Sequence, residues 1–173
     1  MARWIGARTI IAQPAEDAPG LHEVERAARV LQPLGLAGAL PPMRIHADEA
    51  GFEKVRHRIA EFLPGEGTLV GVHISARKPD QRWPAERFAA LMNRLHAERG
   101  ARFMLFWSPG DEDNPLHPGD DRKAQAIIDA CTAPLLPWPT QSLRELIDGL
   151  AACGSVVCSD GGAMHIAAAL GKP

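Results

Sequence analysis

Apolar residues recur along the chain at two different spacings, and the pattern changes near residue 66. From about residue 21 to 34 and from about residue 48 to 63 they recur every three or four positions, which predicts two amphipathic helices. The second helix would bury one face, formed by Phe52, Val55, Ile59 and Phe62. Between the helices, residues 43–46 are a possible short strand, and residues 64–67 are a breaker that ends the second helix.

Beyond residue 66, short apolar runs alternate with helical patterns. In chain order we expect strand 69–74, helix 84–99, strand 102–107, helix 122–131, strand 133–138, helix 142–154, strand 155–159 and helix 162–170. Proline in the third strand makes it an edge strand. This alternation predicts an α/β fold, a Rossmann-like parallel sheet with helices on both faces. Ligands of such sheets bind beyond the carboxyl ends of the strands, so those segments are where chemistry is expected.

Composition narrows the choice of function without identifying it. The 173 residues are 46% hydrophobic and 23% charged, with a formal net charge of -2. These values are ordinary for a globular protein and indicate no basic surface for nucleic acid. Cys131, Cys153 and Cys158 match no zinc-binding spacing, and their odd number argues against a disulfide framework. We therefore interpret them as small buried residues in a reducing compartment.

The two ends of the chain lead to two expectations. Arg8 interrupts the apolar residues near the start, so no signal peptide is visible. No apolar run approaches the ~20 residues of a spanning helix, which favours a cytoplasmic protein. The chain stops at Gly171, Lys172 and Pro173, directly after a helical run. Because Gly and Pro ordinarily lead into a next element there, we expect the sequence to be truncated.

The segment after the first strand combines a hydroxyl group with three cations. Ser75, Arg77, Lys78 and Arg82 all precede the helix that begins near Pro84. Cations beside the free N–H groups of a helix start can bind phosphate oxygens. A solvated basic loop is an equally good interpretation of these residues alone.

The segment after the second strand is acidic and rich in turn residues. Asp111, Glu112 and Asp113 lie near its start, and Asp120 and Asp121 lie at its end. A carboxylate here could accept hydrogen bonds from a ribose or another sugar. The residues themselves favour a simpler interpretation, a solvated turn with an aspartate that caps the next helix.

Asp160, Gly161 and Gly162 follow the last strand and form the most informative segment. Glycine lets the backbone approach a ligand closely, and the helix that begins here directs N–H groups and its positive end at an anion. His165, in the first turn, could donate to a diphosphate, and Asp160 could accept from a sugar hydroxyl. A glycine-rich turn capped by Asp160 explains the same residues equally well.

Several common sites lack their motifs. The chain contains neither G-x-G-x-x-G nor G-x-x-x-x-G-K-[ST], which argues against a dinucleotide site of that type and against a P-loop. Ser159, Asp160 and His165 stand outside a G-x-S-x-G turn, which argues against a hydrolase triad. The seven histidines show no metal-binding spacing.

Taken together and in order, these segments resemble glycosyltransferase family 9, the ADP-heptose:lipopolysaccharide heptosyltransferases and their relatives. The matching parts are the strand at 71–75, the basic loop and Trp-Pro helix start at 77–84 with Phe88, the strand and acidic turn at 106–112, the Ser-Leu-x-Glu-Leu motif at 142–146, and residues 157–173. The last part resembles the family signature Asp-x-Gly-x-x-His-x-Ala-x-Ala-x-Gly. The order and spacing of the motifs carry the resemblance more than any single motif does.

The resemblance implies a two-lobed glycosyltransferase fold of the B type, of which this chain would be a part truncated at both ends. Residues 1–66 would be a remnant of the N-terminal acceptor lobe with its linker, and residues 67–173 an incomplete nucleotide-sugar-binding lobe. The enzyme would transfer heptose from ADP-heptose to a lipopolysaccharide-core acceptor with inversion, peripheral to the inner membrane and without a metal or other cofactor. Its general base would lie in the missing part of the N-terminal lobe, so this chain alone would be inactive.

The same resemblance implies roles for the residues around the last strand and the first. Ser75 would contact phosphate, and Asp160 would bind sugar hydroxyls. The diphosphate would be bound by Gly161, Gly162 and His165.

For the ribose and the leaving-group charge, the resemblance is less direct. Glu112, or else Asp111, would hold the ribose. Family members often carry Lys where this chain has Gln81. We therefore expect Lys78 or Arg82 to supply the positive charge for the leaving group.

Two other functions remain open at the level of sequence. The chain could be a nucleotide-sugar-binding module without transferase activity, or a Rossmann-like enzyme of the sugar-nucleotide epimerase kind. Binding of ADP- or UDP-sugars without hydrolysis or epimerisation would favour transfer.

Overall fold

The computed structural model describes residues 20, 23–36, 38, 41–76, 78–114 and 118–173. The chain divides into two compact units, residues 1–42 and residues 43–173. In the first unit, α1 (Glu23–Leu31) continues into the 3-10 helix η2 (Gln32–Leu34). Gly35, with a φ of 73°, ends this helix by donating to the Gln32 carbonyl. The helix expected over residues 21–34 is therefore present in the described residues 23–34.

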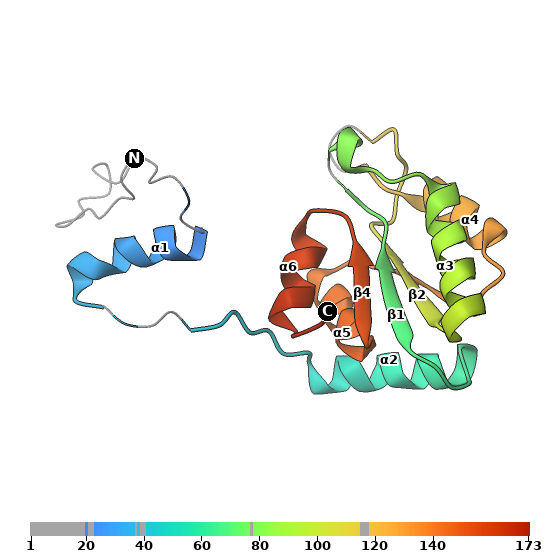
Figure 1. Cartoon of the computed structure of the whole chain (residues 1–173), viewed down its shortest axis with the longest axis horizontal. Coiled ribbons are helices and arrows are strands. Elements are labelled where there is room, and N and C mark those ends of the chain that lie inside the picture. The colour runs from blue at the N-terminus through green and yellow to red at the C-terminus, as the bar shows by residue number, and fades with distance from the viewer. Residues whose placement is uncertain (1–19, 21–22, 37, 39–40, 77, 115–117) are drawn as a thin grey trace. The chain divides into compact units, whose positions relative to one another are not determined.

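The second unit is built on four parallel strands in the order β3-β2-β1-β4 (Figure 1). These are β1 (Leu69–His73), β2 (Arg102–Trp107), β3 (Leu135–Pro139) and β4 (Ser155–Cys158). In register, Val70 of β1 lies between Phe103 of β2 and Ser155 of β4. The predicted parallel sheet is thus confirmed, and the proline-containing β3 is an edge strand as expected.

Helices cover both faces of the sheet, as predicted (Figure 1). They are α2 (Glu49–Phe62), α3 (Ala85–Arg99), α4 (Asp121–Ala130), α5 (Leu143–Ala152) and α6 (Gly162–Ala169), and the short 3-10 helix η3 (Pro79–Gln81) lies in the loop after β1. α3 and α4 pack on the face to which Phe103 and Leu105 point. α2, α5 and α6 pack on the opposite face, with Met104 and Phe106. This alternation follows from the two-residue period of a strand whose two faces are both buried.

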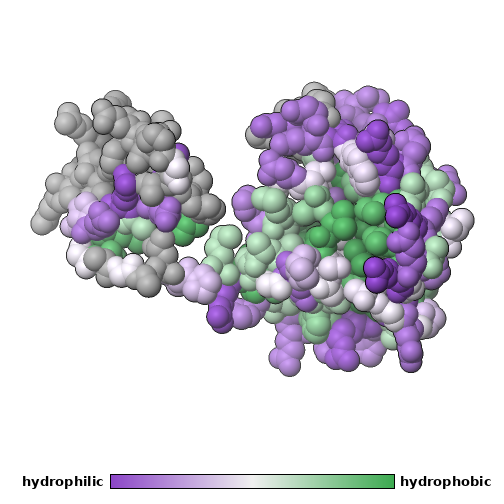
Figure 2. All heavy atoms as spheres, viewed as in Figure 1, coloured by the Kyte–Doolittle hydropathy of each residue, from purple (hydrophilic) through white to green (hydrophobic). Residues whose placement is uncertain are grey.

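The other sheet edge, β4, is only half-buried along its whole length, unlike β1 and β2. Figure 2 shows hydrophobic atoms at the surface of the second unit where Figure 1 places β1 and β4. Val156 of this strand donates its backbone N–H to the Pro173 carbonyl at 2.8 Å. Among the described residues, no helix has the length and apolar character needed to cross a membrane.

Helix boundaries follow local chemistry closely. α3 begins after Pro84 and ends at Gly100, whose φ of 65° is a left-handed conformation that suits glycine. α5 begins after Ser142, whose hydroxyl accepts from Glu145 N–H at 3.2 Å. The Glu145 carboxylate reaches back to the N–H of Gln141 at 2.8 Å, one residue before the usual partner of a capping box.

Two expectations for residues 43–63 were wrong. Residues 43–46 form no strand; Ile45 instead donates one backbone hydrogen bond to Ala169 at 3.0 Å. Phe62 is 50% exposed, and the Arg58 guanidinium stacks 4.4 Å above its ring. Val55 and Leu63 are the buried residues of this segment.

The boundary between the two compact units follows from the packing of α2. It falls between Pro42 and Met43, because α2 packs against α5 and shares the core of the sheet through Val55. The assignment of residues 1–66 to one lobe of a larger enzyme stays a prediction.

All three cysteines are free thiols. Cys153 is buried against Gly71 of β1, and burial raises the pKa of its thiol to about 12. Cys131 and Cys158 are half-buried, and burial raises the pKa of these thiols as well. All three are therefore protonated packing residues, and Cys153 is buried as predicted, whereas the other two are only half-buried.

Candidate functional site

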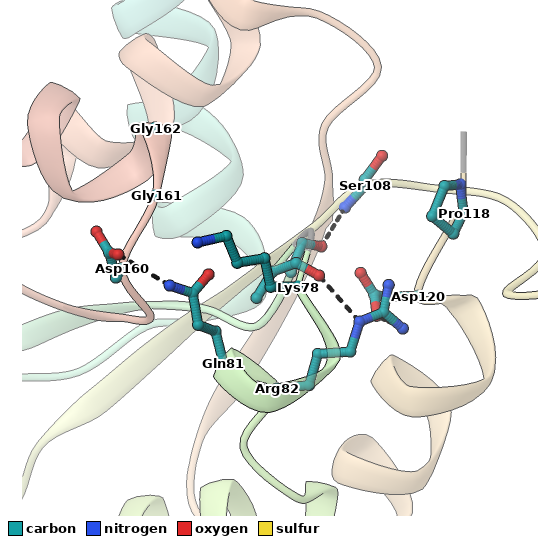
Figure 3. A pocket seen from close by; sticks show the side chains of 11 residues that line it. Lys78, Gln81, Arg82, Ser108, Pro118, Asp120, Asp160, Gly161 and Gly162 are labelled. Carbon is teal, nitrogen blue, oxygen red and sulfur yellow. Dashed lines mark hydrogen bonds and ion pairs between the residues drawn. The ribbon is translucent and has the colours of Figure 1, made fainter. Parts of the chain in front are cut away.

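Loops at the carboxyl ends of β1, β2 and β4 surround a cavity of about 560 Å³. Its lining consists of Ser75, Ala76, Lys78, Gln81, Arg82, Ser108, Pro118, Asp120, Asp160, Gly161 and Gly162 (Figure 3). Most of the site residues predicted from the sequence are in this lining, but Glu112 and His165 are not. The structure thus brings together three segments that are distant in the sequence, at the edge of the sheet where ligands of this fold class bind.

We refer to Asp160, Gly161 and Gly162, between β4 and α6, as the α6 corner. Gln81 donates its side-chain N–H to a carboxylate oxygen of Asp160 at 2.9 Å, and Figure 3 shows this bond at the cavity wall. A Cβ built on Gly161 or Gly162 would meet nothing within 4 Å. The backbone here is therefore open to the cavity, beside the positive end of α6. A ligand anion could approach the N–H groups without a side chain in between.

The loop between β1 and α3 supplies the cations of the cavity. Lys78 is exposed and extends into it, whereas Arg82 is held (Figure 3). The Arg82 Nε donates to the Ala76 carbonyl at 2.9 Å. Ser75 accepts a hydrogen bond from the N–H of Ser108 at 2.9 Å, so its own hydroxyl proton is available to a ligand.

We refer to Ser108, Gly110, Gly119 and Asp120, between β2 and α4, as the α4 corner. The loop from 111 to 118 leaves and returns at one point, because Gly119 lies directly against Gly110. A Cβ on Gly119 would clash with the backbone carbonyl group of Gly110. Asp120 then donates its N–H to the Ser108 carbonyl at 2.9 Å. The chain therefore places Asp120 beside the end of β2, although twelve positions separate it from Ser108.

The neighbouring Asp121 fastens this corner. Its carboxylate accepts from the indole N–H of Trp107 at 2.7 Å and from the Gly110 N–H at 2.9 Å. Thus Asp121, not Asp120, holds the loop at the start of α4.

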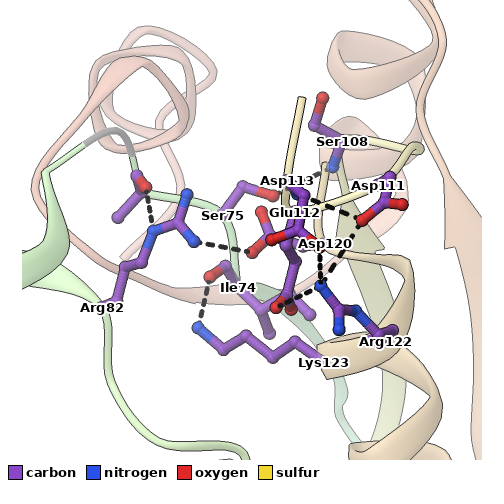
Figure 4. A network of polar contacts seen from close by, with 11 residues as sticks. Ile74, Ser75, Arg82, Ser108, Asp111, Glu112, Asp113, Asp120, Arg122 and Lys123 are labelled. Atoms are coloured by element: carbon purple, nitrogen blue, oxygen red, sulfur yellow. Dashed lines mark hydrogen bonds and ion pairs between the residues drawn. The ribbon is translucent and has the colours of Figure 1, made fainter. Parts of the chain in front are cut away.

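Beside the cavity, the buried Asp120 lies near the partly exposed Arg82 and Lys123 (Figure 4). Asp120 is 1% exposed, and its Oδ1 is 3.9 Å from a terminal nitrogen of Arg82. Lys123 donates to the Ile74 carbonyl at 2.9 Å. Burial lowers the pKa of Lys123, the nearby Arg82 lowers it further, and Asp120 opposes both effects.

His73, at the end of β1, belongs to the same neighbourhood. Burial lowers the pKa of its imidazole from 6.5 to about 4, Asp120 acts in the opposite direction, and Lys123 lowers it further. The ring is therefore neutral at pH 7.

Two predicted residues lie outside the lining. Glu112 is 3.6 Å from Arg122, which also contacts Asp111 at 3.4 Å and Asp113 at 3.1 Å. The excursion of loop 111–118 carries these carboxylates past the α4 corner. His165 is exposed in the first turn of α6. Arg77, one of the three predicted loop cations, lies outside the described residues.

Ser108 and Asp120 are the polar residues of this lining that were not among the predicted site residues. The pair of glycines that flank loop 111–118 was the available signal, because two glycines allow the two ends of a loop to touch. Such contact returns the residue after the second glycine to the end of the strand.

A second cavity, of about 940 Å³, lies between α2, the end of β3 and the start of α5. Its charged residues are of both signs, including Lys54, Arg58 and Glu145. Its buried carboxylate, Asp148, already accepts from the Asp48 N–H at 2.9 Å. None of the predicted site residues lines it. In the described part of the chain, no group of three or more His, Cys, Asp or Glu residues is placed to hold a metal ion.

Comparisons with known proteins found a matching family model and similar proteins. The model of glycosyltransferase family 9 (heptosyltransferase) matches residues 7–173. The lipooligosaccharide heptosyltransferase 2 of Haemophilus ducreyi is 29% identical over 150 residues, which cover 85% of this chain and 41% of that protein. The chain thus spans less than half the length of this curated relative.

Two solved structures have a similar fold. A family 9 glycosyl transferase from Veillonella parvula superposes with a TM-score of 0.74 at 20% identity, covering 95% of this chain and 44% of that one. The E. coli heptosyltransferase WaaC, solved with ADP, superposes with a TM-score of 0.59 at 25% identity, covering 90% of this chain and 45% of the other. The resemblance inferred from the sequence motifs is confirmed.

Proposed function

Since the chain belongs to glycosyltransferase family 9, the heptosyltransferase family, we propose that the cavity between the α6 and α4 corners binds the nucleotide diphosphate of a sugar donor. The observation that carries this proposal is the convergence of Lys78, Arg82 and the glycine backbone of the α6 corner on one cavity. Cations and free N–H groups at a helix start are the groups that bind phosphate oxygens.

In this proposal the donor is ADP-heptose and the acceptor a lipopolysaccharide-type glycolipid. ADP is the nucleotide bound in the E. coli heptosyltransferase WaaC, and a lipooligosaccharide is named as the object of the Haemophilus ducreyi relative. The reaction would take place on the cytoplasmic side of the inner membrane, where the protein would be peripheral.

The chemistry is a displacement at the anomeric carbon of the heptose. An acceptor hydroxyl oxygen forms the new bond on one face, and the bond to the β-phosphate oxygen breaks on the other, which inverts the centre. The acceptor proton passes to a general base, and ADP leaves with the bonding electron pair. Lys78 and Arg82 would stabilise the negative charge that develops on the departing phosphate, so the protein itself supplies the role that a metal ion plays elsewhere.

Other residues of the cavity would hold the donor. The Ser75 hydroxyl would donate to a phosphate oxygen, and the N–H groups of Gly161 and Gly162 would do the same from the opposite side. Asp160, oriented by Gln81, would accept from heptose hydroxyls. These groups raise the effective concentration of the donor in a reactive orientation.

The general base is expected outside this chain, which spans 41% of the Haemophilus ducreyi relative. We propose that residues 43–173 are the donor-binding part of a two-lobed enzyme and that the chain alone binds the donor without transferring it. Calorimetry of the 173-residue chain with ADP, ADP-heptose and UDP tests the proposal. Saturable binding of ADP and ADP-heptose supports it, and binding of none of them contradicts it. Detectable sugar transfer by this chain would refute the part about inactivity.

A further inference from the structure

Asp120 has a feature that its position in the fold does not explain. It occupies the N-cap position of α4, yet its side chain makes no capping hydrogen bond. Asp121 fastens the loop at this point instead, through Trp107 and Gly110. The Asp120 carboxylate is buried, and its Oδ1 has no hydrogen-bond partner among the described residues. A buried carboxylate of this kind is costly unless it serves an interaction.

The group that this oxygen faces is Arg82. Its terminal nitrogen lies 3.9 Å from Oδ1, and its Nε is fixed on the Ala76 carbonyl at 2.9 Å. Figure 4 shows the ion pair between the Arg82 guanidinium and Asp120. One hydrogen bond and one ion pair on the planar guanidinium restrict its rotation, unlike the single exposed ammonium of Lys78. The Arg82 side chain stays 27% exposed and lines the cavity, so its remaining N–H groups are accessible to a ligand.

Asp120 also compensates the repulsion between two cations. Lys123 and Arg82 both lie beside it, and Lys123 is itself fixed on the Ile74 carbonyl. Without the carboxylate, the two positive charges would repel each other, and Arg82, whose side chain is 27% exposed, is the one that borders the solvent. Asp120 therefore determines whether Arg82 stays over the cavity.

We propose that Asp120 is a positioning residue for Arg82: its buried carboxylate holds the guanidinium at the cavity wall, where Arg82 binds the diphosphate of the donor. This inference rests on the proposed function, because it assigns the diphosphate to this cavity. Asp120 acts through Arg82 and does not itself contact the nucleotide.

A double-mutant cycle on the 173-residue chain tests this coupling. The variants are Asp120→Asn, Arg82→Gln and the two together, with ADP and adenosine as calorimetric probes. Asp120→Asn is expected to weaken ADP binding about tenfold and to change adenosine binding less than twofold, because only ADP carries the diphosphate. In the Arg82→Gln background, Asp120→Asn is expected to cost no further ADP affinity. Asp113→Asn is the matched control, since this exposed carboxylate of the same loop pairs with Arg122 at 3.1 Å.

Three outcomes would overturn the inference while leaving the proposed function intact. These are unchanged ADP affinity in Asp120→Asn, equal losses for ADP and adenosine, or full additivity with Arg82→Gln. Equal losses would mean that the carboxylate contacts the nucleoside directly. If the unsubstituted chain binds no ADP, the proposed function and the inference fail together.

A measurement on the unsubstituted protein applies if Asp120→Asn does not fold. The Arg82 Nε–H should give a nuclear magnetic resonance signal protected from solvent exchange, which shifts with ADP and not with adenosine. A signal that is unprotected, or that ADP does not move, contradicts the inference.

Discussion

The two corners of the cavity are built in opposite ways. In the α6 corner, Asp160, Gly161 and Gly162 are consecutive, and the cavity-facing groups follow directly from a strand–glycine–helix sequence. In the α4 corner, Ser108 and Asp120 meet only because loop 111–118 closes on itself. A local motif is visible in the sequence, whereas a closed loop depends on a contact between its two ends.

The two corners also differ in the exposure and in the partners of their carboxylates. The α6 corner is open to solvent, and its carboxylate is paired with a neutral amide, Gln81. The α4 corner holds a carboxylate that is 1% exposed, next to Arg82 and Lys123. We infer that the α6 corner binds the ligand at little cost to the stability of the fold. At the α4 corner, by contrast, the stability of the fold depends on the charges of Asp120, Arg82 and Lys123.

The largest expected effect comes from the glycines of the two corners. Gly119→Ala drives a Cβ into the Gly110 carbonyl group, a clash with backbone that the loop can relieve only by opening. We expect the free energy of unfolding to fall by about 3 kcal/mol in chemical denaturation.

Gly162→Ala is the matched change in the α6 corner. Its Cβ meets nothing within 4 Å, so stability should change by less than about 0.5 kcal/mol, while ADP binding weakens because the methyl group enters the cavity. Equal stability losses in the two variants would remove the distinction between the corners.

The next largest effect is a pH dependence of stability that comes from His73, which lies near Asp120 and Lys123. The pKa of His73 is lowered from 6.5 in the unfolded chain to about 4 in the fold, so the folded state favours the neutral ring. Its contribution to stability is complete above pH 6.5 and is lost as the pH falls toward 4. Between pH 7.5 and 5 the loss should be about 2 kcal/mol. His73→Gln should remove this part of the pH dependence, as measured by denaturation at each pH; an unchanged profile would contradict the prediction.

A smaller effect separates sugar recognition from diphosphate binding. Asp160→Asn should weaken ADP-heptose binding about tenfold, the loss of roughly 1.4 kcal/mol that a charged hydrogen bond can supply. ADP affinity should not fall, because the change removes a negative charge from the neighbourhood of the phosphates. Calorimetry with both ligands checks this, and a parallel loss for ADP would place the diphosphate on Asp160 rather than beside it.

The smallest effect is expected for Glu112, the carboxylate to which the family resemblance assigned the ribose. Glu112 lies outside the cavity lining, and its contact with Arg122 at 3.6 Å involves an Arg122 side chain that is 64% exposed. Exposed ion pairs contribute little to stability. Glu112→Gln should therefore change ADP affinity less than twofold. A tenfold loss would show that Glu112 contacts the nucleotide.

What the sequence predicted well was local. The strands and helices after residue 66 follow from apolar periodicity and from end signals such as Pro84 and Gly100, and they set the parallel sheet and the edge that bears the cavity. The α6 corner was predicted because its residues are contiguous.

What the sequence did not predict depends on contacts between distant positions. The acidic segment was interpreted as a solvated turn with an aspartate that caps the next helix, because N-cap preference is a local rule. The burial of the Asp120 side chain beside Arg82 depends instead on distant positions. In the same way, Phe62 fits the helical period of α2 but is 50% exposed, whereas the adjacent Leu63 is buried in the core. Residues 43–46 have strand-like composition but pair with no strand among the described residues.

A crystal structure of the 173-residue chain soaked with ADP tests the central claim most directly. We predict difference density for the diphosphate between the Arg82 guanidinium and the N–H groups of Gly161 and Gly162. Density for the nucleotide in the larger cavity between α2 and α5, or none at saturating ADP, would contradict it.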